Sequence, residues 1–212
     1  MTTDAAHATH SSPHPLLIVE DDRALAGYLA AALTTQGYHP RLAHDRPQAL
    51  ALLSEPPLPE LVLLDLGLPP QPAVMSEGLA LLDELLLRIP QAKIIVLTGQ
   101  DENAAALEAV RRGAFDFLIK PAALNTLQQA LQRARLFVRE EARLAASGET
   151  RLHLTARLDE GPKEAAAAAE EQLVRRTLTE CDYNVAEAAR RLGMAREHLY
   201  YYLKKYGIQR PA

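Results

Sequence analysis

Residues 61–70 read LVLLDLGLPP, an apolar run that ends on Asp65 and is followed by a glycine and two prolines. A short apolar run bounded by turn residues is typical of a buried central strand. Aspartate is depleted in strands, and burying its carboxylate is costly unless a partner or a metal compensates. Asp65 alone is equally compatible with the start of a turn, where aspartate is common. The neighbouring segments therefore decide why it stands there.

Short apolar runs recur along the first two thirds of the chain, with helical patterns after each. The strand candidates are LLIV (16–19), HPRLA (39–43), LVLL (61–64), KIIVL (93–97) and FDFLI (115–119). The intervening segments are rich in Leu, Ala, Gln and Glu, with apolar residues at helical spacing. Strict alternation of strands and helices predicts an α/β domain with a doubly wound, five-stranded parallel sheet covered on both faces.

Ligands of such domains bind beyond the carboxyl ends of the strands. The polar residues at these ends are Glu20, Asp21 and Asp22 after the first strand, Asp65 after the third, Thr98 after the fourth and Lys120 after the fifth. We therefore expect Asp65 to meet partners brought by other strands. Clustered carboxylates favour Mg²⁺, and a carboxylate can act as a nucleophile toward phosphorus. Lys120 and the Thr98 hydroxyl would then bind phosphoryl oxygens.

Four motifs carry a family resemblance: LLIVEDD (16–22), LVLLDLGLP (61–69), VLTG (96–99) and FDFLIKP (115–121). Together they make residues 16–138 resemble the flavodoxin-like receiver domain of a two-component response regulator. The resemblance implies that a histidine kinase phosphorylates Asp65. It implies Mg²⁺ as cofactor, with Glu20, Asp21, Asp65 and the backbone carbonyl of Gly67 as ligands. It also implies a phosphoryl-binding Lys120 before a cis Pro121, and a switch pair formed by Thr98 and Phe117.

The segment after Asp65 departs from this pattern. Most receivers have a glycine about eight residues after the acceptor, whereas DLGLPPQPAVMSEG delays it to Gly78, a loop about five residues longer. The extended loop 66–78 either alters kinase choice or phosphoryl lifetime, or is a tolerated surface insertion. The loop and the SEGLALLDEL that follows also resemble receivers of regulators linked to PEP-CTERM exopolysaccharide systems.

The end of the chain has a different pattern, in which GPKEAAAAAEEQLVRRTLTECDYN (161–184) predicts one helix. Asn184 is a good N-cap for a short helix that ends at Gly193, and another helix begins near Arg196. Two short helices joined by a tight turn indicate a small all-α helix-turn-helix domain. The motifs AARRLGM and LYYYLKKYGI resemble the Fis-type helix-turn-helix of many response regulators, which binds double-stranded DNA as a homodimer. Residues 164–180 are then expected in the dimer interface.

The second short helix would enter the major groove with its first residues nearest the bases. We expect Arg196 and His198 to contact base edges, and Arg190, Arg191, Lys204 and Lys205 to contact phosphates. Tyr200, Tyr201 and Tyr202 stand where the family often has basic residues. We expect Tyr200 and Tyr201 to contact DNA by hydrogen bonding to phosphates or by stacking, but tyrosines carry no charge, so non-specific binding should be weaker than usual. A helical hairpin with solvated basic faces is the alternative.

The expected organisation is a disordered tail (1–14), a receiver domain (15–138), a linker (139–163) and a DNA-binding domain (164–212). Charge follows this division: residues 1–138 hold 10 Lys/Arg against 15 Asp/Glu, and residues 172–212 hold 8 against 4. No GxxxxGK[ST] loop occurs, and the linker is too short for an ATPase domain. A single cysteine and the lack of a signal peptide or apolar span predict a cytoplasmic protein without membrane contact.

These features predict a DNA-binding transcriptional regulator of a two-component system. A cognate histidine kinase would phosphorylate Asp65, and phosphorylation would favour a DNA-competent dimer. A protein that binds DNA independently of phosphorylation is an alternative with the same fold. An Asp-nucleophile phosphatase is disfavoured, because Gly67 stands where the DxD motif has its second aspartate. No enzyme activity is expected beyond the protein's own phosphoryl transfer and dephosphorylation.

Overall fold

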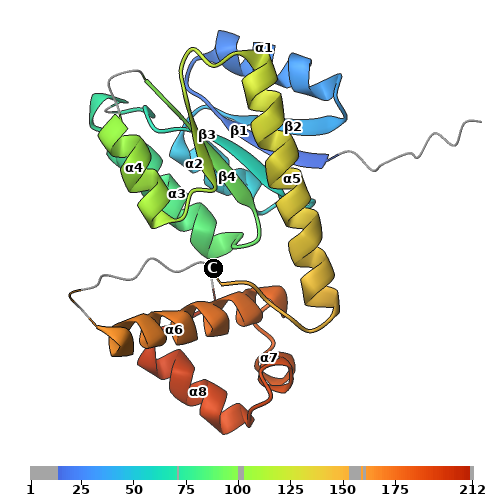
Figure 1. The fold of residues 1–212 in the computed structure, drawn as a ribbon, viewed down its shortest axis with the longest axis vertical. Helices are drawn as coiled ribbons and strands as arrows, with labels where there is room; N and C mark the ends of the chain where they lie inside the picture. Colours follow the sequence, from blue (N-terminus) through green and yellow to red (C-terminus); the bar gives the residue numbers. More distant parts are fainter. Residues whose placement is uncertain (1–13, 71, 100–102, 153–158, 160, 211–212) are drawn as a thin grey trace, which may run out of the picture.

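The computed structural model describes residues 14–70, 72–99, 103–152, 159 and 161–210. An α/β domain and a smaller helical domain are connected through the long helix α5 (Figure 1). The first contains β1 (His14–Val19), α1 (Arg23–Thr34), β2 (Tyr38–Ala43), α2 (Arg46–Leu52), β3 (Leu61–Asp65), the 3-10 turn η1 (Pro72–Val74), α3 (Ser76–Arg88), β4 (Lys93–Thr98), α4 (Asn103–Arg112), β5 (Asp116–Ile119) and α5 (Leu124–Ala146). The second contains α6 (Pro162–Glu180), α7 (Val185–Arg191) and α8 (Arg196–Lys205).

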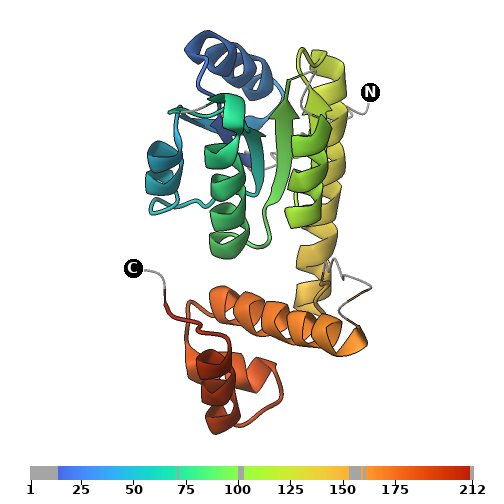
Figure 2. The same ribbon diagram turned by 90° about the vertical axis from the view of Figure 1, so that its left-hand side faces the viewer.

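The five strands form one parallel sheet in the order β2-β1-β3-β4-β5, as the sequence predicts. The central strand β3 is buried along its whole length because helices cover both faces of the sheet. Side chains of α1 and α5 pack on one face, and those of α2, α3 and α4 pack on the other. Figure 2 shows these helices on either side of the strands. The sheet thus brings the strand ends to one edge.

Gly78 allows α3 to pass close to the loop that follows β3. A Cβ built on Gly78 would lie 2.4 Å from Leu66 Cα and 2.5 Å from Leu66 O. No side chain fits this space, so a glycine is required where the helix crosses the loop. This close approach explains why a glycine stands at the end of the extended loop. It also fixes the backbone at Leu66, the residue after Asp65.

The helical domain has its own small core, formed by residues such as Val174, Leu178 and Leu199. The Asn184 side chain accepts hydrogen bonds from Ala186 N at 3.1 Å and from Glu187 N, which caps α7 as predicted. Gly193 adopts a φ of +63° in the turn before α8. The predicted helix-turn-helix is therefore confirmed.

The predicted tail and linker differ in part from the structure. Of the predicted tail, residues 1–13 lie outside the described residues, whereas His14 begins β1. Residues 139–146 of the predicted linker belong to α5, which continues to Ala146. Residues 153–158 and 160 of the predicted linker lie outside the described residues. In the described part of the chain, no helix has both the length and the apolar character to cross a membrane.

Candidate functional site

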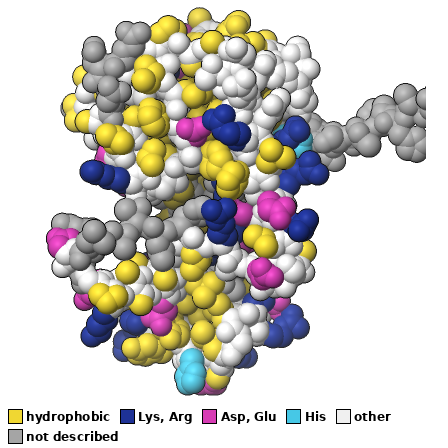
Figure 3. Space-filling model, viewed as in Figure 1, with side chains coloured by type: hydrophobic (Ala, Val, Ile, Leu, Met, Phe, Trp, Pro, Cys, Tyr) yellow, Lys and Arg dark blue, Asp and Glu magenta, His cyan; other side chains and the backbone are white. Residues whose placement is uncertain are grey.

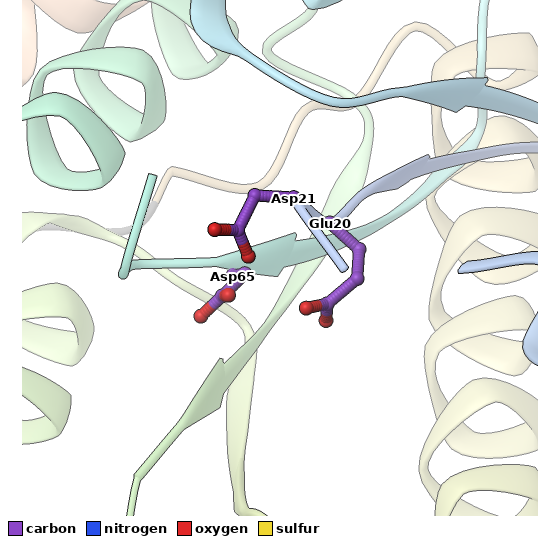
Figure 4. A group of neighbouring side chains, drawn as sticks. All are labelled: Glu20, Asp21 and Asp65. Carbon is purple, nitrogen blue, oxygen red and sulfur yellow. The ribbon is translucent and has the colours of Figure 1, made fainter. Parts of the chain in front are cut away.

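Three carboxylates meet at the carboxyl edge of the sheet. Glu20 and Asp21 follow β1, and Asp65 ends β3, so parallel pairing of these two strands places them together. One oxygen from each lies within 4.8 Å of the others. Figure 4 shows the three carboxylates facing a common space. Glu20 and Asp65 are buried, whereas Asp21 is exposed, which leaves the cluster open to solvent on one side.

Lys120 connects two of these carboxylates. Its Nζ lies 2.9 Å from Asp65 Oδ2 and 2.7 Å from Glu20 Oε2, and it donates a hydrogen bond to Glu20 Oε1 at 2.9 Å. Burial lowers the pKa of Lys120, but the hydrogen bonds to Glu20 and Asp65 outweigh burial and raise it above its ordinary value. Lys120 is therefore a fixed positive charge beside Asp65. The Lys120–Pro121 peptide bond is cis, as predicted.

The surroundings of Glu20 disfavour its charged form. Burial, together with the charges of Asp65 and Asp21, raises its pKa to about 7, although the hydrogen bond and the charge of Lys120 oppose the change. Within the described residues, Glu20 Oε2 is buried and makes no hydrogen bond; Lys120 Nζ lies 2.7 Å away, at ion-pair distance but without hydrogen-bond geometry. His44 Nδ1 lies 2.8 Å from the Glu20 backbone carbonyl. This contact could not be predicted from the sequence, because it depends on the register of β1 and β2.

Asp22 does not join the cluster, although the sequence placed it at the same strand end. Its Oδ1 accepts hydrogen bonds from Ala24 N at 2.9 Å and Leu25 N at 3.1 Å. It is the N-cap of α1, a role that an aspartate before a helix commonly takes. The two adjacent aspartates, Asp21 and Asp22, thus serve different purposes.

The remaining receiver residues surround the same edge. Thr98 is fully buried at the end of β4, one residue beyond Leu97, which pairs with Asp65. Phe117 lies on the neighbouring strand β5 and is partly buried against the core. Gly67 N donates a hydrogen bond to Asp65 Oδ1 at 3.1 Å. The Gly67 hydrogen bond holds the Asp65 carboxylate in place, while the roles of Thr98 and Phe117 as a switch pair stay predictions.

The donor set fits a hard divalent cation. Three carboxylates with oxygens within 4.8 Å supply the ligand type that Mg²⁺ prefers. The buried Glu20 Oε2 adds an acceptor without a hydrogen bond on that edge. The ammonium of Lys120 offsets only part of the three negative charges. Metal binding would relieve the remaining repulsion.

Basic side chains of α7 are exposed but already paired within the domain. Arg190 and Arg191 both pair with Glu187, and Arg191 Nη1 also lies 3.7 Å from Glu180 Oε2. Arg190 is the more exposed, with 77% of its side chain accessible. Exposed pairs of this kind are weak and exchange readily for other anions. Both arginines therefore remain available to phosphates.

The predicted contact residues of α8 divide into two groups. Arg196, His198, Tyr200, Tyr201 and Lys204 are exposed. Lys205 is exposed as well, but two groups hold its ammonium: Nζ lies 2.6 Å from Glu170 on α6 and 4.7 Å from the centre of the Tyr206 ring. Hydrogen bonds to Glu170 and Tyr206 raise the pKa of Lys205 above its ordinary value. Glu170 was not expected to take part in this domain's charge arrangement.

Comparison with known proteins matches each of the two domains to a protein family. Residues 16–132 match the family described as response regulator receiver domain, more than half of the chain. The chain belongs to the response regulators. In this response regulator, residues 165–206 match the Fis family of bacterial regulatory proteins. The acidic edge and the helix-turn-helix described above lie within these two matched ranges.

Similar proteins cover most of the response regulator. The photosynthetic apparatus regulatory protein RegA of Rhodovulum sulfidophilum is 34% identical over 190 residues, which are 90% of this chain and 91% of the relative. RegA of Rhodobacter capsulatus is 33% identical over 194 residues, 92% of each chain. The crystal structure of the NtrX receiver domain from Brucella abortus is 34% identical with a TM-score of 0.52, covering 56% of this chain and 96% of that one. The narrower resemblance to PEP-CTERM regulators stays a prediction.

Proposed function

We propose that a histidine kinase phosphorylates this response regulator on Asp65, and that phosphorylation favours a dimer competent to bind double-stranded DNA. The observation that carries the proposal is the position of Lys120, whose ammonium lies 2.9 Å from Asp65 Oδ2 beside the Glu20 and Asp21 carboxylates. A nucleophilic carboxylate with a fixed cation next to it suits phosphoryl transfer, which depends on positioning and charge neutralisation.

The transfer is a substitution at phosphorus. An oxygen of Asp65 forms a bond to the phosphorus of a phosphohistidine while the phosphorus–nitrogen bond breaks, and the imidazole leaves with the electron pair. Lys120 exchanges part of its contact with Asp65 for a phosphoryl oxygen. The Thr98 hydroxyl donates to another oxygen as the switch residue. Mg²⁺ held by Glu20, Asp21, Asp65 and the Gly67 carbonyl would neutralise further oxygen charge.

The proposed effector step is DNA binding through α7 and α8. Arg196 and His198 lie at the start of α8, where a recognition helix approaches base edges. Arg190, Arg191 and Lys204 supply phosphate contacts, and Tyr200 and Tyr201 add hydrogen bonds or stacking. Lys205 was predicted to contact phosphate; because Glu170 holds it against α6, we assign it to the packing of α8 instead. The matched Fis family and the names of the RegA relatives support a regulatory role, and we propose that the protein acts in the cytoplasm.

The experiment that tests the phosphoacceptor measures covalent modification. The full chain is incubated with Mg²⁺ and a small phosphodonor such as acetyl phosphate, and its mass is measured intact and after proteolysis. We expect one phosphoryl group on the peptide that contains Asp65, and none on Asp65→Asn. Asp116→Asn is the control, since Asp116 pairs with Arg133 away from the cluster. Equal labelling of the wild type and Asp65→Asn would contradict the assignment.

A further inference from the structure

The effector helix α6 lies against the receiver, and charged side chains make the contact. Lys93 begins β4, Glu141 lies near the end of α5, and Arg176 lies in α6. Glu141 Oε2 is 2.7 Å from Lys93 Nζ and 3.6 Å from Arg176 Nη2. All three residues are at least nine-tenths buried. One carboxylate thus joins a cation of the receiver to a cation of the effector.

A second carboxylate extends this contact toward the DNA-binding surface. Glu180 Oε1 accepts hydrogen bonds from Arg176 Nε at 3.0 Å and from Gln91 Nε2 of the receiver at 2.8 Å. Its other oxygen lies 3.7 Å from Arg191, one of the arginines that we assign to DNA. The receiver therefore contacts a residue that also orients a DNA-binding side chain.

Apolar packing contributes little to this interface. Among the described residues, two hydrophobic clusters lie within the receiver and one lies within the effector, and none of them joins the two domains. A hollow of about 610 Å³ separates receiver residues such as Leu86 and Pro90 from α6 residues such as Gln172 and Thr179. In the view of Figure 3, Lys and Arg side chains lie beside Asp and Glu side chains where the two halves meet. The domains are held by polar groups around a gap.

A contact of this composition is suited to opening. Burial lowers the pKa of Lys93, while its hydrogen bond to Glu141 opposes the change. Buried ion pairs recover little more than the cost of their desolvation, and their charges are well solvated after separation. Polar interfaces between domains of one chain resemble transient protein–protein interfaces. The buried charges therefore define one specific closed arrangement without making it permanent.

We propose that Lys93, Glu141, Arg176 and Glu180 form an autoinhibitory latch, which holds α6 against the receiver and opens when Asp65 is phosphorylated. The inference rests on the proposed function. The latched face of α6 belongs to the segment expected to form the effector dimer, so the closed contact covers surface that dimerisation needs. Figures 1 and 2 show α6 between the receiver and the pair α7 and α8. Strand β4 links the two sites, because it carries Lys93 at its start and Thr98 at its end.

The test uses the full chain and two adjacent glutamates of α5. Glu141→Gln leaves two buried cations without their shared charge, whereas Glu140→Gln removes a charge that is exposed and pairs only with Arg143 in the described residues. Gln91→Ala is a milder variant, since it cuts the bond to Glu180 without stranding a buried charge. Circular dichroism confirms that each variant is folded. Small-angle scattering then reports whether the domains separate without a phosphodonor.

Linkage provides a second measurement that does not depend on DNA. Beryllium fluoride serves as the probe for the phosphoryl group on Asp65. Coupling between two sites is reciprocal, so if binding at Asp65 opens the latch, a variant that opens the latch must bind beryllium fluoride more tightly. We expect a larger radius of gyration for Glu141→Gln, and an affinity for beryllium fluoride about ten-fold higher, within the usual range of coupling. Gln91→Ala should shift both in the same direction by less, and Glu140→Gln should match the wild type.

The outcomes separate the latch from the proposed function. Unchanged dimensions and unchanged probe affinity in Glu141→Gln and Gln91→Ala would overturn the latch, even if the wild type binds DNA on phosphorylation. Domain opening with tighter probe binding supports the latch. If the domains open and the probe binds more tightly, but a duplex pool of random sequence is bound neither with nor without the probe, the latch stands and the DNA-binding function fails.

Discussion

Lys120 Nζ and Asp65 Oδ2 lie 2.9 Å apart, although the two residues end strands that are not neighbours in the sheet. Strand β4 separates β3 from β5, so Lys120 must reach across the sheet edge to meet Asp65 and Glu20. This geometry places a positive charge where the oxygens of a phosphoryl group on Asp65 would lie.

Replacing Lys120 with methionine keeps the aliphatic stem and removes the charge. We expect phosphoryl incorporation from acetyl phosphate to slow by roughly 10- to 100-fold, the effect of losing one charge-assisted hydrogen bond in the transition state. The rate is measured by mass spectrometry over time. Lys204→Met removes an exposed charge from the other domain and should leave the rate unchanged. A Lys120→Met rate equal to that of the wild type would show that the ammonium plays no part in transfer.

The adjacent aspartates Asp21 and Asp22 give a matched pair for metal binding. Asp21→Asn removes a cluster carboxylate and should weaken Mg²⁺ binding, measured by titration calorimetry, by about ten-fold or more. Asp22→Asn should leave Mg²⁺ affinity nearly unchanged, because the amide oxygen still caps α1. Chelation of Mg²⁺ with EDTA should stop phosphorylation of every variant. Equal loss of Mg²⁺ affinity in the two variants would refute the division of roles.

Two glycines should respond to alanine in opposite directions. Gly78→Ala places a Cβ 2.4 Å from Leu66 Cα, so we expect a loss of about 1–3 kcal/mol in the free energy of unfolding. Gly27→Ala lies in the exposed face of α1 with no heavy atom within 4 Å of the new Cβ, and should stabilise by about 0.5–1 kcal/mol. Urea denaturation followed by circular dichroism measures both. A neutral Gly78→Ala would mean that α3 does not approach the loop as described.

Two basic residues of α8 should differ in their effect on DNA binding. Arg196→Ala removes an exposed side chain at the start of the helix. It should weaken binding to a DNA duplex selected for affinity to the wild type by about 1–3 kcal/mol. Lys205→Ala should cost much less, because Glu170 and the Tyr206 ring already hold this ammonium. Fluorescence anisotropy with a labelled duplex measures both. The assignment fails if Lys205→Ala weakens binding as much as Arg196→Ala does.

The sequence was sufficient for the sheet and for the acidic edge. Apolar runs such as 61–64 fix which segments are strands, and parallel topology then brings Glu20, Asp65 and Lys120 together. The N-cap Asn184 and Gly193 likewise marked the helix-turn-helix. The use of Asp22 as a helix cap was not apparent, because a strand end and a helix start coincide there. The pairing of Lys205 with Glu170, and of Glu141 with Lys93 and Arg176, depends on packing between helices that periodicity does not encode.

The central claim is that phosphorylation of Asp65 switches DNA binding, and one experiment tests it most directly. DNA affinity and oligomeric state are measured with and without acetyl phosphate and Mg²⁺ for the wild type, Asp65→Asn and the control Asp116→Asn. The account predicts tighter, dimer-linked binding on phosphorylation in the wild type and in Asp116→Asn, and no response in Asp65→Asn. Equal affinity in every condition would contradict it and leave a protein that binds DNA regardless of phosphorylation.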